Sequence, residues 1–248
     1  MGTLSNLGVD LLKGVIKKNI IQETRISIRQ ELNDIQPING NVINHPKLGT
    51  IMLNAAQSKV SSENLATLID SAELWDSIFN SVGSDRIYFL PETSFHLNSF
   101  GSWHKDTGAQ ARAGHFFHWT PFYRDFTVAI YFQENSTSLG GGLDVIPSTH
   151  HTKECTYEKS TINAISLATS ISDAVIFDMR TEHKATWPAQ ENTSQEKIAA
   201  YFTVCAPSSG GDLYLNYLKT RPDYSYLSNF VYPSSWSDLF LKYGIQVL

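Results

Sequence analysis

The chain has 248 residues, a net charge of −5 at pH 7 and 42% hydrophobic residues, which is enough for one sizeable core. It carries no basic block, so we expect no nucleic-acid partner, and no apolar run reaches the ~18 residues of a membrane span. Because no charged, apolar leader opens the chain, and its two cysteines, Cys155 and Cys205, suggest buried reduced thiols, we expect a cytoplasmic protein.

The first third of the chain is expected to be helical. Apolar residues recur near a 3.6-residue period over residues 8–32, which predicts a helix on the flank of the domain, and residues 33–50 carry the prolines and glycines of a loop. A second helical region is expected from Ser61. It restarts at Ser71 with an apolar stripe for the core, and Gly83 ends it.

After Gly83 the apolar period changes to that of short strands, and residues 107–124 and 152–170 are expected to be irregular, the latter with some helical character. The expected strands cover 86–90, 94–98, 103–106, 126–132, 143–146, 173–178 and 197–204, and a short helix follows Ser234. Helices followed by many strands predict one domain over 1–248. It would have a helical flank (about 1–83), a mainly β core (about 84–206) and a C-terminal extension (207–248).

His104 and Asp106 carry the strongest chemical signal. Residues two apart in an extended strand project from one face, so this imidazole and this carboxylate can reach one metal while Lys105 points the other way. The best third ligand is His183, which follows the apolar strand 173–178. Two histidines and one carboxylate leave part of the metal's coordination sphere open, as in non-haem Fe(II) oxygenases. A His-x-Asp pair alone is weak evidence, because such pairs also arise by chance.

The order of the neighbouring segments adds to this signal. The His-x-Asp pair is followed by the glycine turn 140–142, the segment Val145-Ile146-Pro147-Ser148-Thr149-His150 and the strand 172–178 before His183. This order resembles the phytanoyl-CoA dioxygenase-like family of Fe(II)/2-oxoglutarate oxygenases, over roughly residues 86–206. The resemblance implies a double-stranded β-helix (jelly-roll) core with flanking helices, and the metal ligands His104, Asp106 and His183. It also implies the use of Fe(II), 2-oxoglutarate and O₂ to hydroxylate a C–H bond of a small molecule, with release of succinate.

The resemblance also implies how the cosubstrate is held. The family usually places an arginine where Lys197 stands, to bind the distal carboxylate of 2-oxoglutarate; lysine offers a point charge in place of a bidentate fork. Tyr201 would share the strand face of Lys197 and lie near the cosubstrate.

Several polar and aromatic residues are candidate substrate contacts, and they suggest a polar or anionic substrate, such as an amino acid, a natural product or a phosphorylated compound. Each also has a structural alternative: a surface ion pair for an arginine, pairing with Asp178 or Glu182 for the arginine at 180, and packing for the histidines and the tryptophan. The candidates are Arg112, His115, His118, Arg180 and Trp187.

Two other functions stay open at this stage. One is a cupin-like metal protein with non-redox chemistry, such as an isomerase, and the other is a non-catalytic binding protein on the same fold. The sequence leaves the oligomeric state open.

Overall fold

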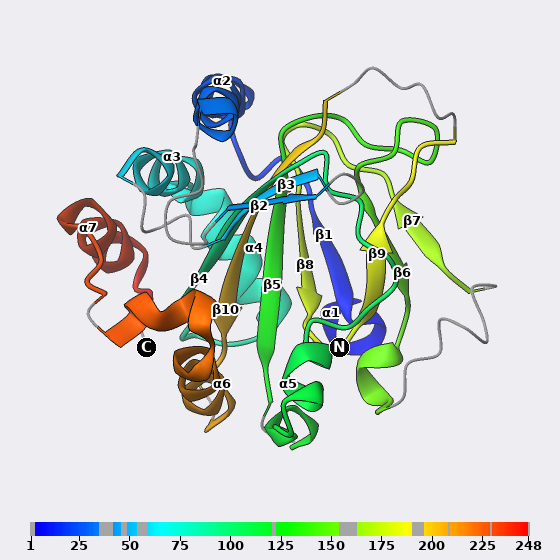
Figure 1. Ribbon diagram of the computed structural model, residues 1–248, viewed down its shortest axis with the longest axis vertical. Helices are drawn as coiled ribbons and strands as arrows, with labels where there is room; N and C mark the ends of the chain where they lie inside the picture. Colours follow the sequence, from blue (N-terminus) through cyan, green and yellow to red (C-terminus); the bar gives the residue numbers. More distant parts are fainter. Residues whose placement is uncertain are drawn as a thin grey trace.

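Two β-sheets face each other and helices cover the outer side of the larger one (Figure 1). The computed structural model describes residues 3–34, 42–45, 49–53, 59–120, 123–153, 163–189, 196–207, 209–228 and 230–247. The major sheet has the strand order β1-β8-β5-β10-β4-β3-β2, with β11 beside β4, and the minor sheet has the order β7-β6-β9. The strands are β1 (Val9–Leu12), β2 (Val42–His45), β3 (Gly49–Leu53), β4 (Tyr88–Leu97), β5 (Asp125–Tyr131), β6 (Leu143–Ile146), β7 (Ile165–Leu167), β8 (Ala174–Asp178), β9 (Glu182–Ala185), β10 (Ile198–Cys205) and β11 (Gln246–Val247).

The chain crosses repeatedly between the two sheets. From β4 onward, β4, β5, β8 and β10 enter the major sheet, and β6, β7 and β9 enter the minor sheet. Between β4 and β5, His104 forms an isolated antiparallel bridge with His183 of β9. This alternation is the double-stranded β-helix, so the predicted mainly β jelly-roll core with flanking helices is confirmed.

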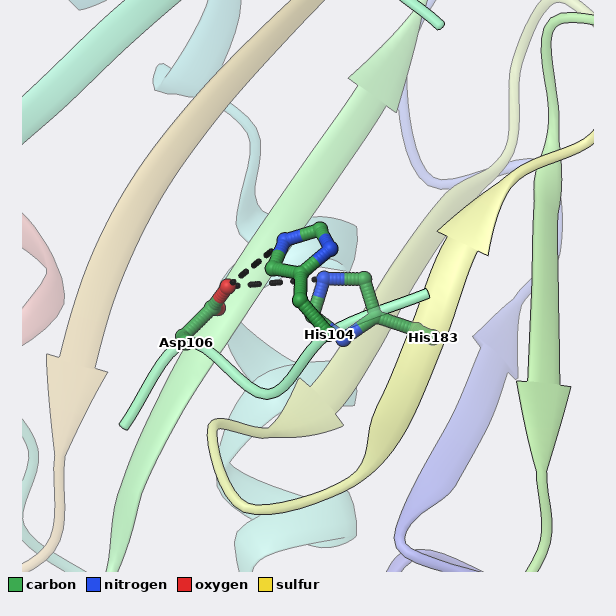
Figure 2. Close-up of side chains that lie close together, drawn as sticks. All are labelled: His104, Asp106 and His183. Carbon is green, nitrogen blue, oxygen red and sulfur yellow. Dashed lines mark ion pairs between the residues drawn. The ribbon is translucent and has the colours of Figure 1, made fainter. Parts of the chain in front are cut away.

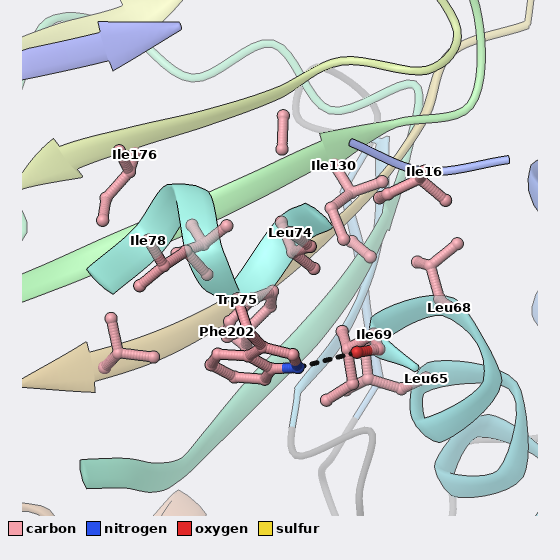
Figure 3. Close-up of a cluster of buried hydrophobic side chains, with 14 of the residues drawn as sticks. Ile16, Leu65, Leu68, Ile69, Leu74, Trp75, Ile78, Ile130, Ile176 and Phe202 are labelled. Atoms are coloured by element: carbon pink, nitrogen blue, oxygen red, sulfur yellow. Dashed lines mark hydrogen bonds between the residues drawn. The ribbon is translucent and has the colours of Figure 1, made fainter. Parts of the chain in front are cut away.

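The helices are α1 (Thr3–Leu7), α2 (Lys18–Asp34), α3 (Lys59–Ile69), α4 (Ala72–Val82), α5 (Gly108–Arg112), α6 (Ser209–Thr220) and α7 (Ser234–Tyr243). The first four and α7 shield one face of the major sheet, whereas residues of α5 and α6 line a cavity. Side chains of α2, α3, α4 and α7 form one buried cluster with alternate residues of the strands, such as Ile130, Ile176 and Phe202 (Figure 3). In this cluster the indole of Trp75 donates to the carbonyl of Ile69 at 2.8 Å, so its one polar atom is satisfied.

The other residues of the same strands point between the sheets. Ala129 and Tyr131 of β5, Val175 and Phe177 of β8 and Ala199 of β10 pack there against the minor sheet. The two-residue period of a strand therefore divides β5, β8 and β10 between a helix-covered core and an inter-sheet interior.

The prediction of one helix over 8–32 is wrong for its first ten residues. There the chain forms β1, which pairs antiparallel with β8, and α2 begins only at Lys18. Gly8 and Gly14, with φ of 77° and 64°, bracket β1. The edge of β8 offers unpaired backbone groups, and satisfying them while burying Val9 and Leu12 outweighs the helical period.

The predicted loop over 33–50 also differs, because β2 and β3 extend the major sheet beyond β4. Residues 35–41 and 46–48 lie outside the described residues. The N-terminal flank thus contributes three strands to the major sheet as well as helices: β1 at one edge, and β3 with β2 at the other.

The two helices predicted after Ser61 are present as α3 and α4. The Ser71 hydroxyl accepts from the backbone N–H of Leu74, and Gly83 closes α4 in the left-handed conformation. The final helix is present as α7.

Two strand predictions need correction. Residues 86–90 and 94–98 belong to one strand, β4, which is interrupted by a bulge opposite Phe202 and Thr203. The strand over 103–106 reduces to the single bridge at His104, followed by a turn. In the segment 152–170, which was expected to be irregular, residues 165–167 form β7. Residues 154–162, which include Cys155, lie outside the described residues.

Cys205 is a buried free thiol, as predicted. None of the described helices is both long and apolar enough to cross a bilayer.

Candidate active site

The side chains of His104, Asp106 and His183 meet between the two sheets (Figure 2). Oδ1 of Asp106 lies 3.6 Å from Nε2 of His104 and 3.4 Å from Nε2 of His183. The three donor atoms all lie within 4.8 Å of one another. Ligands that bind one metal ion at ~2.1 Å are roughly 3 Å apart when they subtend a right angle, so the spacing suits one shared divalent cation.

Backbone pairing brings the two histidines together. His104 and His183 exchange both N–H···O=C bonds, each 2.9 Å long, and their rings lie 4.3 Å apart. A turn after the bridge then directs Asp106 toward both rings. Lys105 leaves in another direction, as predicted, and its buried ammonium donates to the carbonyls of Thr149 and Thr152 at 2.7 and 2.6 Å.

Backbone carbonyls select the tautomer of both histidines. Nδ1 of His104 lies 2.7 Å from the carbonyl of Ser102, and Nδ1 of His183 lies 2.9 Å from that of Thr181. A carbonyl can only accept, so each Nδ1 carries a proton and each Nε2 is the nitrogen left to ligate a metal. Neutral imidazoles held in this way are the form that ligates a metal.

The carboxylate of Asp106 is kept ionised. Burial opposes its charge, but His183 and His104 together hold the pKa of Asp106 well below its usual range. Burial also opposes the charged form of His104. The contact of His104 with Asp106 outweighs the effect of burial, so the pKa of His104 is raised. The Thr127 hydroxyl of β5 donates to Oδ2 of Asp106 at 2.8 Å and so orients the carboxylate from behind.

The triad opens into a cavity of about 410 Å³. One wall follows β4 and β10, where Glu92, Ser94, His96, Tyr201 and Thr203 face inward. Aromatic and basic residues from α5, from α6 and from the segment after α6 also line the cavity. These are Arg112, Tyr214, Tyr217, Arg221 and Tyr224.

The predicted cosubstrate residues lie along one face of the chain through β10. Tyr201 lines the cavity, with its ring 4.6 Å from that of His96, and burial raises its pKa to about 12. Lys197 directly precedes β10, two residues before Ala199, and is buried. It does not line the cavity; its side chain lies against Gly141, where a Cβ atom would come within 2.5 Å of the lysine Cδ.

The predicted substrate contacts are only partly brought together. Arg112 lines the cavity near His104, whereas Arg180 forms a two-pronged ion pair with Asp178 at 2.7 and 2.9 Å, which was its structural alternative. Neither the two histidines of the 115–118 loop nor Trp187 lines the cavity. His115 packs on Tyr217, His118 is buried beside Tyr123, and Trp187 is exposed beside Phe100.

Sequence reasoning missed Glu92, Thr127, Tyr217 and Tyr224, and it favoured core packing for Tyr214 over a place in the pocket wall. Glu92, Ser94 and His96 do alternate on one strand face, a polar pattern that could have marked the wall of a site. The pattern was not recognised because two separate strands were expected over 86–90 and 94–98, and Glu92 belongs to neither of them.

Comparison with known proteins shows similarity at the level of structure. No protein-family model matches the sequence, and no curated protein matches it. AviO1 from Streptomyces viridochromogenes Tue57 matches with a TM-score of 0.65 and 14% identity, over 83% of this chain and 92% of that chain.

Two further similar structures involve 2-oxoglutarate, which is also called alpha-ketoglutarate. EctD from S. alaskensis, determined with 2-oxoglutarate and 5-hydroxyectoine, matches with a TM-score of 0.64 and 14% identity over 82% of this chain and 74% of that one. The non-heme alpha ketoglutarate dependent epimerase SnoN from nogalamycin biosynthesis matches with a TM-score of 0.61 and 11% identity over 82% and 80%. At these identities the similarity establishes the shared fold.

Proposed function

We propose that this protein is an Fe(II)- and 2-oxoglutarate-dependent oxygenase of the phytanoyl-CoA dioxygenase-like type that oxidises a small molecule. The observation that carries the proposal is the His104, Asp106 and His183 triad, whose Nε2 and carboxylate atoms converge at the wall of a cavity inside a jelly roll. Nitrogen and oxygen ligands in a two-histidine, one-carboxylate set suit Fe(II) and leave positions for a keto acid and O₂. Neighbours of the same fold use alpha-ketoglutarate or were crystallised with it, which supports this choice.

The residues of the chain have distinct tasks in this function. His104, Asp106 and His183 would hold the iron, and Thr127 would fix the orientation of the carboxylate. Bound Fe(II), with 2-oxoglutarate and O₂, supplies the oxidising chemistry: 2-oxoglutarate loses CO₂ to become succinate while a C–H bond of the substrate is oxidised, with hydroxylation as the expected outcome. The buried cavity would exclude water and hold the substrate beside the metal.

Lys197 is the proposed partner of the distal carboxylate of 2-oxoglutarate. Burial lowers the pKa of this lysine, so a carboxylate placed beside it would stabilise its charged form. Tyr201 lies on the same face, between Lys197 and the part of β10 nearest the metal triad. The pair would therefore define the cosubstrate end of the interior.

The decisive experiment measures succinate formed from 2-oxoglutarate in air with Fe(II). The wild-type protein is expected to form succinate, and His104→Ala is expected to lose both this activity and stoichiometric iron. Lys197→Ala is expected to keep its iron but to show a KM for 2-oxoglutarate raised roughly tenfold or more, since it loses a buried ion pair. A wild-type protein that binds Zn²⁺ or Mn²⁺ but never forms succinate would instead support non-redox chemistry, and full iron binding by His104→Ala would refute the metal site.

A further inference from the structure

A second carboxylate faces the cavity and takes no part in the metal triad. Glu92 lies in β4 at a bulge: Phe202 of β10 pairs with Thr93, the next residue, Thr203, pairs with Leu90, and Glu92 lies in the stretch between these two pairs. Bulges of this kind redirect side chains beside active sites. Here the bulge brings Glu92 to the cavity wall together with Ser94 and His96.

Hydroxyl groups hold the Glu92 carboxylate from three sides. Oε2 accepts from Thr203 at 3.0 Å and from Tyr214 at 2.5 Å, and Oε1 accepts from the Tyr224 hydroxyl at 3.0 Å. Hydroxyl donors of this kind favour the ionised carboxylate, but they bring no positive charge. No basic side chain of the described chain forms an ion pair with Glu92.

Aromatic rings complete the surroundings of this carboxylate. Tyr214, Tyr217 and Tyr224 all line the cavity, and at most 5% of each is exposed. The rings of Tyr214 and Tyr217 stack with their centroids 6.1 Å apart. Tyr214 and Tyr224 present their hydroxyl edges to Glu92, and the guanidinium of Arg221 already lies over the ring of Tyr224 at 4.7 Å. The attraction for an ammonium group therefore comes from the buried carboxylate itself, whose charge has no ion-pair partner among the described side chains.

The position of Glu92 determines how far from the His104, Asp106 and His183 triad a group bound to Glu92 would lie. Thr203, which donates to Glu92, lies directly opposite Thr127, which donates to Asp106. Opposite residues of an antiparallel pair have Cα atoms about 5 Å apart, so a group bound at Glu92 lies within roughly 10 Å of the triad. A molecule anchored there can present a carbon a few bonds away to the metal.

We infer that Glu92, with Tyr214, Tyr217 and Tyr224, binds a protonated amine of the substrate, so that the oxygenase acts on a cationic small molecule. This inference rests on the proposed function for the reaction, but its binding site is independent of the metal ligands. Burial raises the pKa of Glu92, and an ammonium ion would offset that cost by restoring an opposite charge. Of the polar or anionic substrates that the sequence suggested, one carrying only negative charge would meet repulsion at this end of the cavity, and Arg180 is already paired with Asp178.

Two ligands of matched shape test the site. Binding of 2-phenylethylammonium and of 2-phenylethanol to the full chain is measured by calorimetry, without oxygen, in the presence of Fe(II) and 2-oxoglutarate. The ammonium is expected to bind roughly tenfold more tightly than the alcohol. Glu92→Gln, which keeps the shape, is expected to remove this preference, while the exposed Glu63→Gln makes the same charge change on α3 and leaves both affinities unchanged. Equal affinities in the wild type, no ammonium binding, or an unchanged preference in Glu92→Gln would each overturn the inference.

Acidification gives a second test that needs no variant. Protonation of Glu92 removes its charge, so the affinity for the ammonium should fall relative to that for the alcohol as the pH is lowered. A ratio of affinities that stays constant would contradict the proposed pairing even if Glu92→Gln failed to fold.

The test also separates this inference from the proposed function. Ammonium preference that persists in a protein unable to form succinate would refute the oxygenase and leave the Glu92 site standing. Succinate formation without ammonium preference would do the reverse.

Discussion

Thr127 of β5 hydrogen-bonds the carboxylate of Asp106, one of the proposed metal ligands. Its hydroxyl donates to Oδ2 of Asp106, and so turns Oδ1 toward His104 and His183. We expect Thr127→Val, which keeps the shape, to weaken metal affinity about tenfold, because partners behind a ligand typically contribute 10–100-fold. Titration of the metal-free protein with Fe(II) or Mn²⁺ measures this effect.

Thr203→Val is the matched control for that substitution. Thr203 lies opposite Thr127 on the adjacent strand and also donates to a carboxylate, but to Glu92 instead of Asp106. Its replacement should leave metal affinity unchanged. Equal losses in the two variants would show that the effect of Thr127→Val comes from packing alone.

Among single residues, the sequence could identify the three proposed metal ligands, which the structure brings together, but not the residues that hydrogen-bond them. His104, Asp106 and His183 are recognisable from residue type, spacing and order along the chain. Nothing in the sequence pairs Thr127 with Asp106 or Thr203 with Glu92, since both contacts depend on strand register and on the bulge in β4.

β1 shows how one element is determined by its neighbours. Gly8 adopts φ of 77° at the junction of α1 and β1, and a Cβ atom there would come within 2.3 Å of Thr181 Oγ1 and 2.5 Å of His150 Nδ1. The Thr181 hydroxyl also donates to the Gly8 carbonyl at 2.9 Å, so the close approach is part of the docking of β1.

Gly8→Ala is therefore expected to lower the free energy of unfolding by about 3 kcal/mol, as the sum of left-handed strain and overpacking. Gly14→Ala is the control, because Gly14 also has positive φ, but its Cβ would meet nothing within 4 Å. That change should cost only about 1 kcal/mol. Denaturant unfolding compares the two, and equal costs would mean that β1 is not held closely at Gly8.

At the scale of elements, prediction succeeded where local signals agree with the tertiary environment. Ser71 and Gly83 bound α4 as expected, and the apolar run at 173–178 became β8. Prediction failed over residues 8–17, where an amphipathic segment lies beside the open edge of the sheet. There the hydrogen bonds between β1 and β8, which are about 165 residues apart in the chain, outweigh the local helical period of the apolar residues.

The whole molecule is expected to lose stability in mild acid, partly through His118. Burial first, and then Arg180 and Lys105, lower the pKa of this histidine to about 4. In the unfolded chain its pKa is ~6.5. Between these two values the unfolded state binds more protons than the folded state, so the free energy of unfolding decreases as the pH is lowered. The contribution of His118 between pH 7 and pH 5 is about 2 kcal/mol.

Thermal unfolding over this pH range tests the contribution. His118→Gln should flatten the dependence of Tm on pH, whereas His151→Gln, at an exposed position, should leave it unchanged. Identical slopes in both variants would place the acid sensitivity elsewhere.

The sequence by itself determined the class of the fold and identified the three side chains proposed as metal ligands. The period of apolar residues in a strand and the residue types that bind metals can both be recognised from the sequence without knowing the fold. Only the tertiary structure decided which residues form the cavity, that Arg180 is neutralised by Asp178, and that Glu92 faces the same space as the triad. Those facts depend on strand register, on the bulge in β4 and on the packing of the segments after β10. These features bring residues that are distant in the sequence within a few ångströms of one another, and the spacing of residues along the chain does not reveal them.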